Sequence, residues 1–100
     1  MFVKLYNYKI KIKDLPKWKN IQRSVKAIYR KYGDPIKWTY LIDRKEEYVT
    51  ITEISSYFSR KDFLRIKKEV DNDKEISKLF NKFLEIVHRK KIVDKSIKLT

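Results

Sequence analysis

The side chains that could act in catalysis or metal binding are few, and their spacing mostly fits structural roles. His88 is the only histidine and cysteine is absent, so a zinc site with several histidine or cysteine ligands is excluded. Asp71, Asp73 and Glu75 have the spacing of the first ligands of a calcium loop. Ile76, however, stands where that loop requires glycine. We therefore expect helix capping in this segment and no metal site.

Gly33 is the only glycine, which excludes the glycine-rich loops that cradle phosphates in nucleotide-binding proteins. No cofactor is expected on these grounds. The run His88 to Lys91 is cationic and suits the C-terminal end of a helix, so we expect His88 to be a surface residue. None of these residues is a clear catalytic group, and whether the chain is an enzyme stays open.

The chain is strongly basic, with 26 lysine and arginine residues against 13 aspartate and glutamate residues and a formal net charge of +13. Such a charge attracts nucleic acids, anionic membrane surfaces or acidic partners. Lysine-rich, glycine-poor chains also arise from genome base composition or from life at high temperature. Both interpretations of the charge stay open.

Four of the basic residues recur at helical spacing on the outer face of a helix that we predict over residues 15–32. They are Lys19, Arg23, Lys26 and Arg30. No acidic residue occurs between positions 15 and 33. This basic stripe supports a nucleic-acid-binding module, whereas the simpler interpretation is an ordinary solvated helix face.

One hundred residues suit a single domain, and we expect one over residues 1–100. With 42% hydrophobic and 14% aromatic residues, the chain can fill a core without a disulfide or a metal. The first residues lack the apolar segment of a secretory signal, and no apolar run has the length of a membrane helix. We expect a cytoplasmic protein with no membrane contact.

Apolar periodicity predicts the elements that must position these residues. Residues 2–12 alternate as a strand with one continuous apolar face. Residues 15–32 have helical spacing, with Asp14 as N-cap, Pro16 in the first turn and Gly33 as the C-terminal stop. Residues 35–56 predict a β-hairpin, in which the charged connector 44–47 joins two alternating strands.

Another helical region and a last strand complete the chain. Ser59 and Asp62 form a capping pattern that begins a helix, and Asp71-Asn72-Asp73 predicts a break before the apolar stripe of residues 76–87. Residues 92–99 alternate as a strand. This order predicts an α+β, ferredoxin-like βαββαβ fold: a four-stranded antiparallel sheet with helices on one face and the second helix broken near Asp71-Asp73.

That plan leaves one face of the sheet uncovered. The strands nevertheless have apolar residues at both odd-numbered and even-numbered positions, which point to opposite faces of the sheet. On the first strand, for example, Val3 and Leu5 alternate with Tyr6. A solvated face would be consistently polar. We therefore expect the uncovered face to meet a second subunit, a ligand or stacked bases.

Several features of the chain resemble the dimeric α/β-barrel superfamily, which includes antibiotic-biosynthesis monooxygenase-like and haem-degrading proteins. They are the βαββαβ plan, the size, the strand-to-serine start of the second helix at 54–59, the broken helix at 71–73 and the run 75–80. The resemblance covers nearly the whole chain. It implies a homodimer in which two sheets close face to face and enclose a pocket.

The functional residues of the haem-degrading members match this chain at one position. Asn7 fits their asparagine on the first strand. Their tryptophan near the end of the third strand has no counterpart, because Ile54-Ser55 ends the strand here. His88 comes too late in the chain to match their haem ligand. The resemblance therefore does not extend to haem degradation.

Two functional hypotheses follow. The first is a homodimer through the uncovered face with a small-molecule pocket between the sheets. Its most specific version is a cofactor-independent, monooxygenase-like enzyme. Its candidate pocket residues are Asn7, Tyr8, Trp38 and Tyr40, of which Asn7 and a tyrosine would orient a ligand through hydrogen bonds. The alternative is a basic nucleic-acid-binding module that uses Lys19, Arg23, Lys26 and Arg30.

Overall fold

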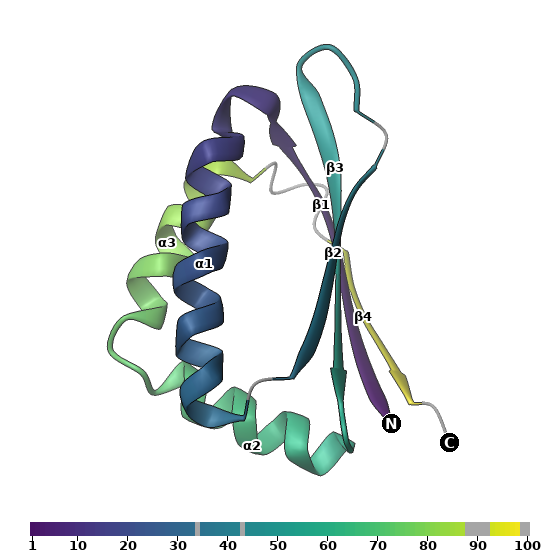
Figure 1. The fold of residues 1–100 in the computed structure, drawn as a ribbon, viewed down its shortest axis with the longest axis vertical. Helices are drawn as coiled ribbons and strands as arrows, with labels where there is room; N and C mark the ends of the chain where they lie inside the picture. Colours follow the sequence, from purple (N-terminus) through teal and green to yellow (C-terminus); the bar gives the residue numbers. More distant parts are fainter. Residues whose placement is uncertain (34, 43, 88–92, 99–100) are drawn as a thin grey trace.

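The computed structural model describes residues 1–33, 35–42, 44–87 and 93–98, with the backbone alone for Tyr40, Ile42 and 93–98. The elements in chain order are β1 (Phe2–Lys11), the 3₁₀ turn η1 (Ile12–Asp14), α1 (Leu15–Tyr32), β2 (Ile36–Ile42), β3 (Tyr48–Tyr57), α2 (Arg60–Asp71), α3 (Ile76–Ile86) and β4 (Val93–Lys98) (Figure 1). None of the helices in these ranges has the length and apolar character needed to cross a membrane.

The strands form one antiparallel sheet in the order β2-β3-β1-β4. All three helices lie on the same side of this sheet, so that within the described residues its other face is uncovered (Figure 1). The connector of the β2–β3 hairpin closes with a hydrogen bond from the Lys45 amide to the Tyr48 carbonyl at 2.9 Å. The predicted α+β ferredoxin-like fold is confirmed, and the hairpin lies where the sequence predicts it.

The ends of α1 lie where the sequence predicts them. Pro16 lies in the first turn, where its missing N–H needs no partner. Gly33 ends the helix with a φ of 152°, and a Cβ there would lie 2.5 Å from Cδ1 of Ile66 on α2. Asp14 occupies the predicted N-cap position. Its side chain makes no capping bond, because η1 leads the backbone into α1 with Asp14 already in helical geometry.

The second helical region is broken, as the sequence predicts. The Oγ of Ser59 caps α2 by accepting the backbone N–H of Asp62 at 3.1 Å. The helix α2 ends at Asp71 and α3 begins at Ile76. His88, for which we predicted a surface position, lies outside the described residues.

Asp73, in the segment between α2 and α3, connects this segment to the C-terminal end of α1. Its carboxylate accepts the backbone N–H of Glu75 at 2.9 Å and the hydroxyl of Tyr32 at 2.8 Å. Lys31 Nζ lies 3.6 Å away. The hydrogen bond from Glu75, followed by that from Tyr32, lowers the pKa of Asp73. The residues predicted to interrupt the helix therefore connect three helices.

The apolar interior consists of two clusters between the helices and the sheet. One is formed by Tyr8, Ile10, Trp18, Ile21, Val49, Ile51, Ile86 and Val87. The other is formed by Phe2, Ile28, Tyr57, Phe63, Ile66 and Val70. Both clusters use the even-numbered residues of β1 and the odd-numbered residues of β3, because directly paired residues project from the same face of a sheet.

Candidate functional site

Polar side chains cross the helix-facing side of the sheet between the two apolar clusters. Two cross-strand pairs of β1 and β3 lie there, and β2 adds one residue to each. The rows are Lys4, Ser55 and Lys37, and then Tyr6, Glu53 and Thr39. We call these six residues the polar belt. Lys4 and Ser55 are buried, so part of the belt belongs to the interior.

Tyr8 connects the first apolar cluster to the polar belt. Its hydroxyl oxygen accepts the indole N–H of Trp18 at 2.8 Å, and its own O–H donates to Glu53. The ring is almost completely buried and packs edge-on against Phe83 of α3 at 4.9 Å between centroids. Burial raises the pKa of Tyr8, and the charge of Glu53 raises it further. The phenol therefore stays protonated and acts as a fixed donor to Glu53.

Glu53 is a half-buried acid with partners on three elements. Burial raises its pKa above the ordinary value of a glutamate. The charge of Lys37 and the hydrogen bonds of Tyr8 and Gln22 oppose this shift without cancelling it. Such a carboxyl group keeps its proton to a higher pH than a surface glutamate, which is a property of many general acids and bases.

A pair of tyrosines lies on the other side of the belt. The Tyr57 hydroxyl is hydrogen-bonded to Tyr29 of α1 and to Ser55, and burial is the main cause that raises the pKa of both tyrosines. Lys37 Nζ lies 3.5 Å from the centroid of the Tyr29 ring. At this distance the face of the ring stabilises the ammonium group, so Lys37 is held between Tyr29 and Glu53.

Lys4 is a buried cation beside two aromatic rings. Its Nζ lies 5.5 Å from the centroid of Tyr6 and 5.4 Å from that of Phe63. These distances are within the range of cation–π attraction. The polar belt thus contains two lysines that contact aromatic faces and one acid whose pKa is raised.

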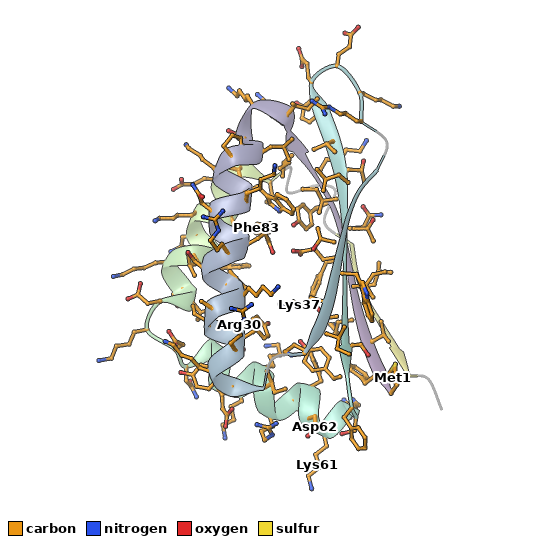
Figure 2. The ribbon with its side chains drawn as sticks, in the orientation of Figure 1. Met1, Arg30, Lys37, Lys61, Asp62 and Phe83 are labelled. Atoms are coloured by element: carbon orange, nitrogen blue, oxygen red, sulfur yellow. The ribbon has the colours of Figure 1, made fainter. Side chains whose placement is uncertain are left out.

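A hollow of about 240 Å³ opens beside Tyr29, between α1 and the edge strand β2. Its lining consists of Lys26, Tyr29, Arg30, Pro35, Ile36 and Lys37. Figure 2 shows Lys37 extending from the sheet toward α1, the helix that carries Arg30. A second hollow of about 460 Å³ at the start of α1 has Asp14 and Glu85 beside its lysines, so its charge is mixed.

The uncovered side of the sheet carries apolar residues near one end and polar residues in the middle. Strand pairing places on it Val3, Leu5, Asn7, Lys9, Ile36, Trp38, Thr50, Thr52, Ile54 and Ser56, which we call the open face. Leu5, Ile54 and Trp38 form one cross-strand row, and Val3, Ser56 and Ile36 form the next. Trp38 and Ile36 are 44% and 61% exposed.

The structure does not bring the four predicted pocket residues to one place. Asn7 and Trp38 lie on the open face, and Tyr40 is paired with Thr52, which is also the partner of Asn7. Tyr8 lies on the opposite, helix-facing side. Successive residues of a strand point to opposite faces, so a single pocket on the open face cannot include both Asn7 and Tyr8.

The predicted basic stripe lies on the surface of α1. Its four residues are exposed, and within the part of the chain that the structure describes none of them forms an ion pair. Lys26 and Arg30 also line the hollow beside β2. Nucleic-acid binding by this stripe stays a prediction.

Sequence reasoning missed the polar belt. The signal was present in the sequence as charged residues at strand positions whose side chains face the core. Lys4 interrupts the apolar face of β1, and Glu53 follows Val49 and Ile51 at two-residue steps on β3. Only the register of β1 against β3 shows that Lys4 and Glu53 lie in neighbouring rows. Lys37 belongs to the belt because the odd-numbered residues of β2, which are less apolar than the even-numbered ones, face α1.

The sequence of the chain matches no family model and no curated protein. Solved structures do match it. An uncharacterised NIPSNAP domain protein from Burkholderia xenovorans has a TM-score of 0.76 at 11% identity, over 100% of this chain and 95% of that chain. An antibiotic biosynthesis monooxygenase has a TM-score of 0.71 at 11% identity, over 100% and 99%.

A third similar structure is SnoaB, a cofactor-independent oxygenase from Streptomyces nogalater. Its TM-score is 0.67 at 7% identity, and the match covers 99% of this chain and 93% of that chain. At such identities the likeness shows a shared fold. The predicted resemblance to the antibiotic-biosynthesis monooxygenase-like proteins is therefore confirmed at the level of the fold.

Proposed function

We propose that the chain forms a homodimer through its open face and that the two sheets enclose a small-molecule pocket. The observation that supports this most directly is the pair of neighbouring rows on the uncovered face of the sheet, which are apolar except for Ser56 and include the exposed residues Trp38 and Ile36. Contiguous exposed apolar surface is typical of interaction sites, and aromatic residues are enriched at interface centres. A second copy related by a two-fold axis presents the same rows and can bury them.

The polar part of the open face is the proposed pocket. Asn7 and Thr52 are directly paired and lie beside the apolar row of Leu5 and Ile54. Small-molecule sites commonly combine apolar walls with a few hydrogen-bonding groups that orient the ligand. Asn7 and Thr52 would supply those groups, and Trp38 would supply part of the apolar wall. Tyr40, paired with Thr52, is the further candidate on the edge strand.

The reaction class to test first is oxidation without a cofactor, because SnoaB has this fold and is a cofactor-independent oxygenase. Oxygen uptake by the purified chain with an aromatic diol, and without added metal, flavin or haem, tests that part of the proposal. Asn7→Ala should abolish any such turnover, since Asn7 is the amide of the proposed pocket. Turnover that Asn7→Ala leaves unchanged would separate the reaction from the open face.

Charge substitutions test the dimer. Ile54→Lys places a cation in the middle of an apolar row, and we expect it to convert a micromolar dimer into a monomer in sedimentation velocity. Leu64→Lys is the matched control, because Leu64 is an exposed apolar residue of α2, on the helix side. A monomeric wild-type chain, or dissociation caused by Leu64→Lys alone, would contradict the proposal.

The alternative is nucleic-acid binding by the basic stripe, which is supported by the exposure of its four cations on α1. Such binding should weaken steeply as salt is raised, because phosphate contacts release counterions. Reversing the charge of Lys19, Arg23, Lys26 and Arg30 together should abolish it. An oligonucleotide that fails to bind even at low salt removes this alternative.

A further inference from the structure

The hollow between α1 and β2 is lined by several cations. Three of its lining residues are cations, namely Lys26, Arg30 and Lys37. The other three lining residues in the described part of the chain are uncharged. Like charges that converge on one concavity repel one another and create a positive potential there. An anion bound in the hollow would relieve that repulsion.

Two elements hold the three cations in place. Lys26 and Arg30 lie four residues apart on α1, so they are neighbours on the same side of the helix. Lys37 comes from β2, and its Nζ is positioned over the ring of Tyr29. An arginine beside two lysines is well suited to an anion, because its planar guanidinium can donate two parallel hydrogen bonds to a phosphate or carboxylate.

The described acids near the hollow are Glu53, which interacts with Lys37, and Asp71, whose charge acts on Tyr29. Asp34, which precedes Pro35 in the sequence, lies outside the described residues. The helix α1 has no acidic residue, and neither Lys26 nor Arg30 forms an ion pair within the described ranges. Lys37 interacts with Glu53, and the burial of Glu53 disfavours the ionised form of that acid. Lys26 and Arg30 therefore line the hollow without a paired acid among the described residues.

The size and the walls of the hollow limit the ligand. A volume of about 240 Å³ is somewhat below the roughly 300–1,000 Å³ of typical small-molecule pockets, so the hollow suits a small ligand. Tyr29, Pro35 and Ile36 give the hollow an apolar side next to its cations. We propose that this hollow binds a small anionic molecule in which a phosphate or carboxylate group is joined to a short apolar part.

This inference goes beyond the proposed dimer and does not depend on it. The cations of the hollow lie on α1 and on the helix-facing side of β2, and Ile36 is the one described residue that belongs both to the lining of the hollow and to the apolar rows of the open face. Ile54→Lys should therefore abolish the dimer and leave anion binding intact. Failure of one proposal can be told from failure of the other in the same preparations.

The test is an NMR titration of the isotope-labelled full chain with phenyl phosphate, benzoate, inorganic phosphate and phenol. Gly33 gives the only glycine amide signal, and it connects α1 to the segment that lines the hollow. We expect a saturable shift of this signal with phenyl phosphate or benzoate, weaker binding of inorganic phosphate and none of phenol. Comparison of the first two ligands shows which anionic group the hollow prefers.

Charge reversal then locates the site. Lys26→Glu with Arg30→Glu should weaken binding by about tenfold or more, since each hydrogen bond to a charged group contributes about that factor. Lys78→Glu with Lys82→Glu is the matched control. It makes the same charge change, at the same spacing, on exposed residues of α3. This control should bind as the wild type does, and the unchanged indole signal of Trp18 verifies that both variants are folded.

Three results would overturn the inference. The first is the absence of saturable binding with both phenyl phosphate and benzoate. The second is an equal loss of affinity in the two double variants, which would mean that overall charge and not the hollow attracts the anion. The third is a shift of the Gly33 signal by an oligonucleotide but by no small anion, which would favour the nucleic-acid alternative.

Discussion

Trp18 donates its indole N–H to the hydroxyl oxygen of Tyr8 at 2.8 Å, and this bond joins α1 to β1 inside the first apolar cluster. Tyr8 in turn donates to Glu53 on β3. A buried hydrogen-bond chain therefore runs from the helix through β1 to the acid of the polar belt. It fixes the rotation of α1 over the sheet, and with it the position of the basic side chains on that helix.

Tyr8→Phe should destabilise the fold by about 1 to 3 kcal/mol, because it leaves the buried N–H of Trp18 without its partner and deprives Glu53 of a donor. Urea unfolding of Tyr8→Phe, Trp18→Phe and the double variant measures the coupling between the two residues. The double variant should lose less than the sum of the single losses. Strictly additive losses would show that the hydrogen bond contributes nothing to stability.

Glu53→Gln should change how stability depends on pH. Burial raises the pKa of Glu53, so above the ordinary glutamate pKa of about 4.3 the folded chain retains a proton that the unfolded chain has released. Wild-type stability therefore falls as pH rises through this window. The glutamine variant cannot ionise, so its stability relative to the wild type should increase from acidic to neutral pH.

Thermal unfolding of both proteins across this pH range measures the difference. Asp73, whose pKa is lowered, acts in the opposite direction at more acidic pH, but it is present in both proteins and cancels. Glu47→Gln, in the exposed hairpin connector, is the matched control and should follow the wild type at every pH. A wild-type advantage over Glu53→Gln that grows toward neutral pH would contradict the burial of this acid.

Gly33→Ala should destabilise the protein by about 1 to 3 kcal/mol, because its φ of 152° is unfavourable for alanine and the new Cβ would lie 2.5 Å from Cδ1 of Ile66. Chemical denaturation measures the loss. Adding Ile66→Val removes that Cδ1 atom, so it should cost less in the Gly33→Ala background than in the wild type. Ser24→Ala, on the exposed side of α1, should stay within about 0.5 kcal/mol of the wild type.

The fold could be predicted from local patterns because each element has a clear period or boundary signal. Gly33 and Ser59 mark helix ends for reasons of backbone geometry and capping that act within a few residues. Asp14 shows the limit of such signals. It occupies the N-cap position that its residue type suits, yet after the preceding 3₁₀ turn its side chain makes no capping bond. Boundaries that depend on the incoming chain direction cannot be deduced from residue type alone.

The sites depend on register, which local patterns do not determine. Asn7, Tyr8 and Trp38 were all predicted as pocket residues. Alternation along β1 already separates Tyr8 from Asn7, but only the pairing of β1 and β2 with β3 places Trp38 on the face of Asn7. The more apolar, even-numbered residues of β2 face away from the helices. Trp38 is therefore partly exposed, and Lys37 points toward the helices. The hairpin pattern is compatible with either orientation, because a shift of one residue exchanges the two faces.

The central claim is that two chains meet through their open faces, and isotope-filtered NMR of a mixture of labelled and unlabelled chain tests it most directly. The account predicts nuclear Overhauser effects between protomers, from the Trp38 indole to the methyl groups of Leu5 and Ile54, and a mass twice that of the 12.3 kDa chain. A single-chain mass without these contacts, or contacts between protomers confined to the helices, would contradict it.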